Sequence, residues 1–400
     1  MNRNIALYPY FQFCRSLIFW QAIWFLYFES VVSASEAILL AAIFDLSVVV
    51  LEVPSGYFSD YLGRRLSLMI SLIASMAGCL LLFSSTSFAV FVVAQVLLGA
   101  GGAFVSGTDN ALLYDSLAEQ SRQDEVAAQE VRAWRFTYSA LAISAITGGY
   151  LSMEAFRPAY LITAIALLAG LVIVFMFREP PHAREHTSTM QPWRQISTVF
   201  SRLQDRALFW VFIFAVGAYV LSHVPYVFAQ PYLKEVLSKV GYASDTPVVS
   251  GIITAAMMMV SVVAGAFVLA LRKRIGTTGM LLLAMLMQTG LILALAFLIH
   301  PAVIFLLVFR MVPDALSKPL ILEIIHPRIE SGYRATYLSF QSLFGRLTLS
   351  GTLILSAWFT TDAQSVTEAT LRTILPYYGA AGLVLIGVLA IMAKSNLKNL

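Results

Sequence analysis

Charged residues are scarce in this sequence. Only 26 Lys and Arg and 22 Asp and Glu occur among 400 residues. They make up 12% of the chain, whereas a soluble chain carries about 25% charged residues. So few charges cannot cover a water-facing surface, which excludes a soluble enzyme. Sustained heptads and low-complexity tracts are missing too, which excludes a coiled coil, collagen and a disordered chain.

Cysteine is nearly absent as well. Cys14 and Cys79 fall at different depths of the expected helices, too far apart for a disulfide. Neither has a ligand partner at a metal-binding spacing, so we expect two packing residues and no metal. The sequence also lacks a phosphate-binding loop of the form G-x-x-x-x-G-K-[S/T], which excludes ATP as the energy source. No catalytic constellation occurs at a credible spacing, so we expect neither an enzyme nor a cofactor.

Long apolar runs take the place of the missing charges. Apolar residues make up 59% of the chain, and residues 66–108, 207–233 and 275–309 contain no charge. A membrane-spanning helix needs about 20 apolar residues. The sequence therefore predicts an all-α membrane protein with twelve spanning helices, at 10–29, 36–58, 66–84, 88–115, 131–152, 156–177, 207–231, 246–271, 278–299, 301–325, 334–359 and 371–393.

The basic residues fall mainly on one side of these helices. Loops on that side carry Arg64, Arg65 and Arg272 among many others. The opposite side holds only four basic residues, which are Arg157, Lys234, Lys239 and Arg372. Because short basic loops stay in the cytoplasm, we expect an inner-membrane protein with both termini cytoplasmic. The net charge of +4 then reflects topology, and nucleic-acid binding is not expected.

The longest polar stretch divides the chain. It covers residues 178–206, between the sixth and seventh expected helices. We therefore predict an N-terminal bundle at 1–177, a cytoplasmic connector at 178–206 and a C-terminal bundle at 207–400. Paired bundles in many transporters enclose a site near the bilayer midplane. A monomer is expected, with the lipid bilayer and a small-molecule substrate as its partners.

The most specific motif joins the second and third helices. It runs from Gly56 to Arg65 in the form G-x-x-x-D-x-x-G-R-R. Gly56 permits close helix approach and Gly63 permits a tight turn. Asp60 stands where a helix terminus or a basic partner can satisfy it, and Arg64 and Arg65 hold the loop in the cytoplasm.

With this loop and its helix count, the whole chain resembles the major facilitator superfamily. The resemblance implies two six-helix bundles and secondary transport by alternating access, with helices one, four, seven and ten around a central cavity. It also implies that the loop at Asp60 latches the two bundles together. The alternative, that Arg64 and Arg65 only follow the positive-inside rule, leaves Asp60 and the two glycines unexplained.

Other family motifs are weaker here. In the second-half copy of the loop, Lys273 stands where the aspartate should be, and in helix four Gln95 replaces an arginine. Helix five ends in Gly148 and Gly149, as in the glycine-rich pattern of antiporters, but Ala145 replaces the proline. By this resemblance, export by antiport is favoured only modestly.

Three further charges are gating candidates. Asp109 and Asp115 lie toward the inner end of helix four, where either could receive Arg64 or Arg65. Arg334 enters helix eleven from the cytoplasm, opposite the expected position of Asp60. Topology alone would also place an arginine there.

Carboxylates within helix two are candidates for proton coupling. A charge at bilayer depth costs at least about 2.5–3.5 kcal/mol, and Asp45 and Glu52 lie two turns apart on one face. Burial that raises its pKa would let Asp45 take up and release a proton, so we place it first. The alternative is an Asp45 that is paired with a basic group and never titrates. Glu52 could instead bond to the inner gate or to Arg15.

Helix ten carries a stripe of three charges. Arg310, Asp314 and Lys318 follow at intervals of four residues, and lipid exposure would be prohibitive. Arg310 and Lys318, with Arg346 of helix eleven, are therefore candidate substrate ligands, and Asp314 is a further proton-coupling candidate. The alternative is an ion-pair ladder that stiffens the helix, which Arg346 of helix eleven could complete.

The remaining binding candidates are polar or aromatic: Gln21, Trp24, His223 and Tyr226. Aromatic faces suit flat or cationic organic ligands, although Trp and Tyr also serve as interface anchors. The leading interpretation is a proton-coupled antiporter that exports small amphipathic organic compounds. The alternatives are proton-coupled uptake of an organic anion and, in a different class, a transport-inactive sensor or an intramembrane enzyme.

Overall fold

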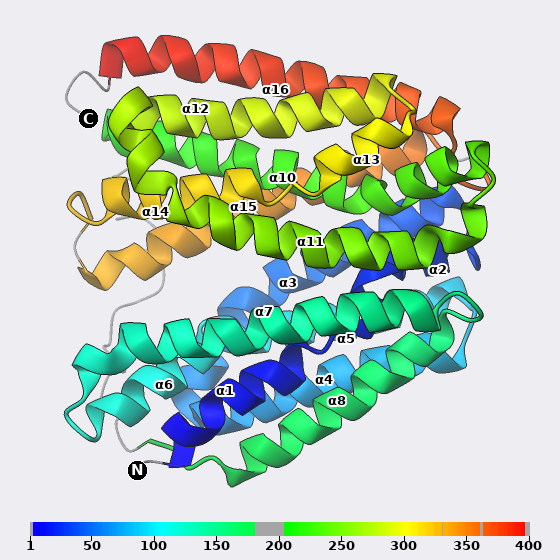
Figure 1. Cartoon of the computed structure of the whole chain (residues 1–400). Coiled ribbons are helices and arrows are strands. Elements are labelled where there is room, and N and C mark those ends of the chain that lie inside the picture. Colours follow the sequence, from blue (N-terminus) through cyan, green and yellow to red (C-terminus); the bar gives the residue numbers. More distant parts are fainter. Residues whose placement is uncertain (1–2, 181–203, 330, 361–362, 397–400) are drawn as a thin grey trace. The chain divides into compact units, whose positions relative to one another are not determined.

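The computed structural model describes residues 3–180, 204–329, 331–360 and 363–396. These residues are helical apart from short turns (Figure 1), as the sequence predicts. They belong to two compact units, which we describe separately. Unit 1 contains residues 1–189 and 247–255, and unit 2 contains residues 190–246 and 256–400. Most of the predicted connector lies outside the described residues, so its role stays a prediction.

Unit 1 is built around α4. It contains α1 (Arg3–Ser16), η1 (Phe19–Ala22), α2 (Trp24–Glu29), α3 (Ala34–Leu62), α4 (Arg64–Ser84), α5 (Phe88–Val105), α6 (Thr108–Ala118), η2 (Gln123–Glu125), α7 (Val126–Leu151) and α8 (Arg157–Met176). Helix α4 packs against α5 and α8, while α1 packs against α7 and α8 (Figure 1).

Unit 2 is built around α10 and α12. Its helices are α10 (Arg206–Lys239), η4 (Ala243–Asp245), most of α11 (Thr246–Ala266), α12 (Val268–Phe297), α13 (Pro301–Leu307), α14 (Val312–Ile325), α15 (Ser331–Trp358) and α16 (Glu368–Asn396). Helix α10 packs against α15 and α16, and α12 packs against α14 and α16. Glu368 binds Lys239 and Arg372, which ties the start of α16 to the end of α10.

Eight described segments are long and apolar enough to cross a membrane: α3, α4, α5 with α6, α8, α10, η4 with α11, α12 and α16. The other four predicted spans fall outside this group for two reasons. Those at 10–29 and 301–325 are divided into short helices. Those at 131–152 and 334–359 form the long helices α7 and α15, which carry arginines and many hydroxyl groups.

Three predicted helices are interrupted, so those predicted at 10–29, 88–115 and 301–325 are not continuous, although α5 and α6 together remain one candidate span. The first begins already at Arg3 and breaks after Ser16. The fourth breaks at Gly107, whose φ of 75° ends α5 and precedes α6. The tenth breaks before Pro313, which lacks a backbone N–H and lies in the first turn of α14.

Local signals explain the boundaries of α3 and α4. Ser33 begins α3 with a capping box, in which its side chain and that of Glu36 each accept a backbone N–H. Gly63 alone joins α3 to α4 with a φ of 108°, a conformation that glycine adopts without strain. The turn predicted at Gly63 is therefore present. Within unit 1, however, no atom lies within 4 Å of a Cβ built at Gly56, so the close approach predicted there is not found.

An aromatic cluster fills the core of unit 1 beside the divided first helix. Trp20 stacks on Tyr160 with the ring centroids 5.8 Å apart, and Tyr27 packs against Phe91 and Tyr160. The Tyr27 hydroxyl donates to the carbonyl oxygen of Leu82 at 2.6 Å. Large rings buried in this way contribute much of a core's stability, and they hold η1 and α2 in place.

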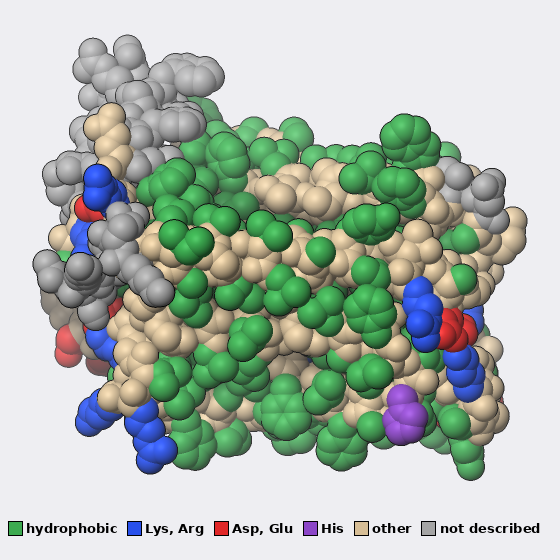
Figure 2. All heavy atoms as spheres, turned by 90° about the horizontal axis from the view of Figure 1, so that it is seen from above, with side chains coloured by type: hydrophobic (Ala, Val, Ile, Leu, Met, Phe, Trp, Pro, Cys, Tyr) green, Lys and Arg blue, Asp and Glu red, His purple; other side chains and the backbone are tan. Residues whose placement is uncertain are grey.

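The surface of unit 2 fits a lipid environment. Figure 2 shows hydrophobic side chains over the middle of the face on which α16 lies, with charged side chains at its two ends. On α16, Tyr377, Val384 and Ile391 are 72%, 67% and 72% exposed. A water-facing surface would not present such a continuous apolar face.

The start of α1 is fastened to the end of α8 by Asn4. Its side chain donates to the carbonyl oxygen of Arg178 and accepts from the Arg178 N–H, both at 2.8 Å. It also donates to Ser116 Oγ at 2.8 Å. One buried amide therefore joins α1, α6 and the segment after α8.

We predict that Asn4→Ala lowers the free energy of unfolding by about 1–3 kcal/mol, because buried polar groups lose their partners. Thermal unfolding in detergent, followed by circular dichroism, measures the effect. The control is Gln123→Ala, in an exposed turn, which should unfold like the wild type. Equal stability of the two variants would contradict the role given to Asn4.

Candidate functional site

The interruption in the first helix is supported by neighbouring helices. The backbone N–H of Phe19 donates to Thr163 Oγ1 of α8 at 3.0 Å. Gln21, predicted to bind substrate, donates to the carbonyl oxygen of Leu141 at 2.8 Å and to Ser144 Oγ at 3.1 Å. Its amide nitrogen is therefore engaged with α7.

Gly148 of α7 lies against the same interruption. A Cβ at Gly148 would lie 1.9 Å from the carbonyl oxygen of Phe19. No other residue type fits there without a backbone shift. The glycine pair noted at the end of helix five thus has a local structural role in unit 1.

A polar network crosses unit 1 between α1 and α6. Gln12 Nε2 donates to Asp109 Oδ2 and to the Tyr8 hydroxyl, each at 2.8 Å. The Tyr8 hydroxyl donates to Asn110 Oδ1 at 3.1 Å. Arg15 Nη1 lies 3.5 Å from Asp109 Oδ2, and Asp109 is only 8% exposed. A charge pair with hydrogen bonds to its neighbours is the form in which buried charges are tolerated.

This network decides between two carboxylates that could meet the loop arginines. Asp109 pairs with Arg15, whereas Asp115 pairs with Arg64. The reason is the break at Gly107, which redirects the chain after α5. The sequence also allowed Arg15 to bond to Glu52, but the ion pair of Arg15 is formed with Asp109.

The loop between α3 and α4 holds its charges within unit 1. Arg64 Nη1 lies 2.5 Å from Asp60 Oδ1, and Arg64 Nε lies 3.6 Å from Asp115 Oδ2. Arg65 donates to the carbonyl oxygens of Val174 and Phe175 at the end of α8. The contact of Asp60 with Arg334 would join the two units and stays a prediction. In unit 2, Arg334 donates to the carbonyl oxygens of His326 and Ile329.

Glu179, which follows α8, also binds this loop. Its carboxylate accepts the backbone N–H of Arg64 at 2.6 Å and that of Arg65 at 2.9 Å. Both donors belong to the first turn of α4, where helical N–H groups have no partner within the helix. A carboxylate at that end is also stabilised by the helix dipole. Glu179 therefore caps α4 from the segment that follows α8.

The membrane carboxylates of helix two lie in α3. Asp45 is 7% exposed and Glu52 is half-buried. Trp24, a predicted substrate ligand, is 4% exposed and packs edge-on against Phe25 and Phe28. It therefore belongs to the aromatic core.

In unit 2, two guanidinium groups lie over tyrosine rings of α10. Arg310 Cζ is 5.3 Å from the ring centroid of Tyr226. Arg346 Cζ is 5.5 Å from that of Tyr219. His223 lies between these tyrosines in sequence, stacks on Tyr219 at 3.9 Å and engages the Tyr219 carbonyl oxygen through Nδ1 at 2.8 Å.

The ladder suggested for helix ten is only partly formed. Lys318 Nζ lies 3.9 Å from Asp314 Oδ2, and Gln288 donates to Asp314 Oδ1 at 3.2 Å. Arg310 instead donates to the carbonyl oxygen of Ser222 at 3.4 Å. The break between α13 and α14 takes Arg310 out of helical register with Asp314, which is why the first step of the ladder is wrong.

Comparison with known proteins gives the family. The model of the Major Facilitator Superfamily matches residues 11–353. The chain belongs to this superfamily. It is accordingly a multi-pass membrane protein that carries out secondary transport, and it is not an enzyme.

Two solved structures illustrate the shared fold. The nucleoside transporter NupG is 13% identical, with a TM-score of 0.79 over 98% of this chain and 100% of that chain. The peptide transporter POT in complex with sulfate is 13% identical, with a TM-score of 0.73 over 99% and 95% of the two chains. No curated protein sequence matches this superfamily member significantly.

Sequence reasoning missed several polar residues of this transporter. Tyr8, Gln12 and Arg15 lie on one face of α1 at helical spacing, a pattern that was visible. A first helix assumed to begin at residue 10 hid it. Glu179 and Gln288 had no local signal, because their partners are distant in sequence.

The Arg15–Asp109 pair can be tested by a double-mutant cycle. Arg15→Gln and Asp109→Asn should each destabilise the protein, because each leaves a buried charge unpaired. The double variant should recover about 1–3 kcal/mol relative to the sum of the single effects. Thermal unfolding in detergent gives these values. The exposed pair Arg122 and Glu125 is the control and should show a smaller coupling. Strict additivity at Arg15 and Asp109 would count against the pair.

We also expect Glu179→Ala to destabilise the transporter by about 1–2 kcal/mol, since α4 loses its cap. Glu154→Ala removes an exposed glutamate and should leave the unfolding temperature unchanged. The capping role fails if the two variants unfold at the same temperature.

Proposed function

We propose that this transporter is a proton-coupled antiporter of the inner membrane that exports small amphipathic organic compounds by alternating access. It works as a monomer with both termini in the cytoplasm. The proposed substrate class rests on two guanidinium groups that lie over tyrosine rings in unit 2. Arg310 lies over Tyr226, and Arg346 lies over Tyr219.

This arrangement suits a ligand that has both a ring and a polar acceptor. A guanidinium group has five N–H donors. Among the described residues, Arg310 makes one hydrogen bond, at 3.4 Å to Ser222. Most of its donors therefore remain for a carboxylate, phosphate or carbonyl group. Tyr226 and His223 supply aromatic surface for the apolar part.

Asp45 is the preferred proton carrier. It is a carboxylate within a membrane-spanning helix and is 7% exposed, and such intramembrane carboxylates are functional candidates by default. Asp314 and Glu52 are the further candidates. Asp314 already has Lys318 and Gln288 as partners.

The proposed direction of transport, export, rests on the glycine pattern at the end of α7. Gly148 packs directly against the interruption of the first helix, so the pattern lies at an element that alternating access would have to move. NupG and POT are described as transporters of nucleosides and peptides. At such low identity they support the fold, and their substrates are not transferred to this chain.

A second candidate function is proton-coupled uptake of an organic anion. The arrangement of charges in unit 2 favours it. Lys318 lies beside the carboxylate of Asp314, whereas Arg310 lies over Tyr226 and donates to the carbonyl oxygen of Ser222. The further donors of Arg310 suit an anionic group.

Both functions can be tested in inside-out vesicles with an imposed proton gradient and a pH-sensitive dye. Cationic, neutral and anionic organic compounds are added to wild type, Asp45→Asn and the exposed control Asp124→Asn. We expect at least one compound to collapse the gradient in wild type and in the control, and none to do so in Asp45→Asn. Arg310→Gln should weaken the apparent affinity for the transported compound about tenfold or more, through a lost charged hydrogen bond.

The opposite outcomes are equally informative. Gradient collapse that persists in Asp45→Asn removes Asp45 from the proton path. If nothing moves protons in these vesicles but organic anions accumulate in right-side-out vesicles, uptake replaces export. If neither occurs, proton coupling is wrong.

A further inference from the structure

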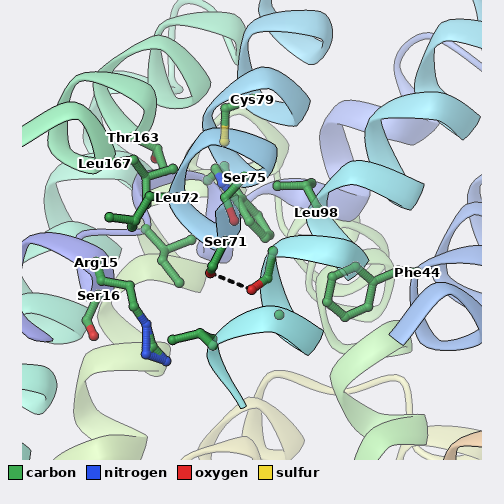
Figure 3. Close-up of a pocket in the computed structure, with 15 residues that line it drawn as sticks. Arg15, Ser16, Phe44, Ser71, Leu72, Ser75, Cys79, Leu98, Thr163 and Leu167 are labelled. Atoms are coloured by element: carbon green, nitrogen blue, oxygen red, sulfur yellow. Dashed lines mark hydrogen bonds between the residues drawn. The ribbon is translucent and has the colours of Figure 1, made fainter. Parts of the chain in front are cut away.

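A cavity of about 200 Å³ lies inside unit 1, beside the interruption of the first helix (Figure 3). Its walls come from the end of α1, from η1, and from α3, α4, α5 and α8. Every lining residue belongs to unit 1. None of the residues of the guanidinium and tyrosine surface of unit 2 contributes to its lining.

Two backbone features leave this space empty of side chains. The first helix ends at Ser16 and helical structure resumes at Phe19, so the helix is interrupted at residues 17 and 18. On the facing helix α5, the cavity is lined by Gly101 and Gly102. A Cβ at Gly101 would lie 1.9 Å from Ser75 Oγ, so the glycine gives the Ser75 hydroxyl its place on the cavity wall.

The polar groups on the wall include the Arg15 guanidinium, the Trp20 indole N–H and several hydroxyl groups, among them that of Ser75. Arg15 and Ser75 both line the cavity (Figure 3). Among the described residues, the contacts of the Arg15 guanidinium are long, 3.3 Å to Gln12 and 3.5 Å to Asp109, so it retains donors for a ligand. The Trp20 indole N–H is buried without a hydrogen bond to a described oxygen or nitrogen, next to the weakly accepting Cys79 thiol.

The rest of the wall is apolar. Leu72, Leu98 and Leu167 line it together with Phe44. An apolar cavity of roughly 150 Å³ takes up benzene, so this one has room for a single ring with a short substituent. A purely apolar occupant would keep the Arg15 donors from water without replacing their hydrogen bonds, which is costly. A cation would be repelled by Arg15.

We propose that this cavity binds a small organic acid with a compact apolar body, in the size class of an aromatic monocarboxylate. The carboxylate lies against Arg15, where charge-assisted hydrogen bonds are strongest, and the ring lies among Leu72, Leu98 and Leu167. The proposed site contains no residue of unit 2, and its occupancy does not depend on the direction or coupling of transport.

Benzoate is the probe, measured by isothermal titration calorimetry on the full-length protein in detergent. Benzyl alcohol, which has a similar shape and no charge, is the comparison ligand. We expect benzoate to bind and benzyl alcohol to bind roughly tenfold to a hundredfold more weakly, the equivalent of one charge-assisted interaction.

Two neighbouring leucines of α8 provide matched variants. Leu167 lines the cavity, whereas Leu168 is 49% exposed on the outer face. Leu167→Trp fills the cavity and should abolish benzoate binding, while Leu168→Trp should bind like the wild type. If Leu167→Trp does not fold, Arg15→Lys serves instead. It keeps the charge beside Asp109 but loses the planar fork of donors, and it should weaken benzoate binding about tenfold.

Arg310→Gln separates this site from the transport site. Benzoate should bind to this variant as to wild type, even where transport is impaired. Binding that survives Leu167→Trp but is lost in Arg310→Gln would place benzoate in unit 2 and overturn the proposal. Equal binding of benzoate and benzyl alcohol, or no binding of benzoate to wild type, would overturn it as well.

Discussion

A helix interrupted within a bilayer must satisfy its free backbone groups inside the protein, because lipid offers no hydrogen bonds. Three helices of this transporter are interrupted, at residues 17–18, 106–107 and 308–311. The interruptions are tolerated because neighbouring helices supply partners or space. Thr163 accepts the Phe19 N–H, and Gly148 leaves room for the Phe19 carbonyl group.

Charged side chains that are candidates for function lie at or beside these interruptions. Arg15 directly precedes the first one, Asp109 follows the second, and Arg310 lies within the third. A break releases a side chain from helical register, so it can meet a partner on another helix. Arg15 and Asp109 meet each other in this way, and Arg310 reaches Tyr226 and Ser222 of α10. The cavity of unit 1 also lies at such an interruption, because residues on both sides of the break in the first helix line it.

The motif loop of unit 1 and its counterpart in unit 2 use the same kind of contact. In unit 1, Arg64 at the start of α4 pairs with Asp115 of α6. In unit 2, Arg272 of α12 pairs with Glu323 of α14 at 2.6 Å. The second loop lacks the aspartate of the motif, yet its arginine still fastens the loop to the following bundle helix. The motif thus contains two separable parts, a local arginine anchor present in both units and an aspartate present only in the first.

The sequence by itself determined the membrane class, the positions of most helices, the turn at Gly63 and the family. These features follow from local composition, since about 20 apolar residues or one glycine suffice to specify them. Only the tertiary structure decided where helices break and which charges pair. Either Asp109 or Asp115 could have met the loop arginines, but Asp109 meets Arg15 and Gln12, the latter 97 residues away in sequence. The sequence left open whether Arg310 pairs with Asp314, and in the structure it packs on Tyr226. Hydropathy is averaged over a whole helix, so it does not reveal an interruption of two to four residues. The partner of a side chain on another helix depends on tertiary packing, which no local sequence pattern predicts.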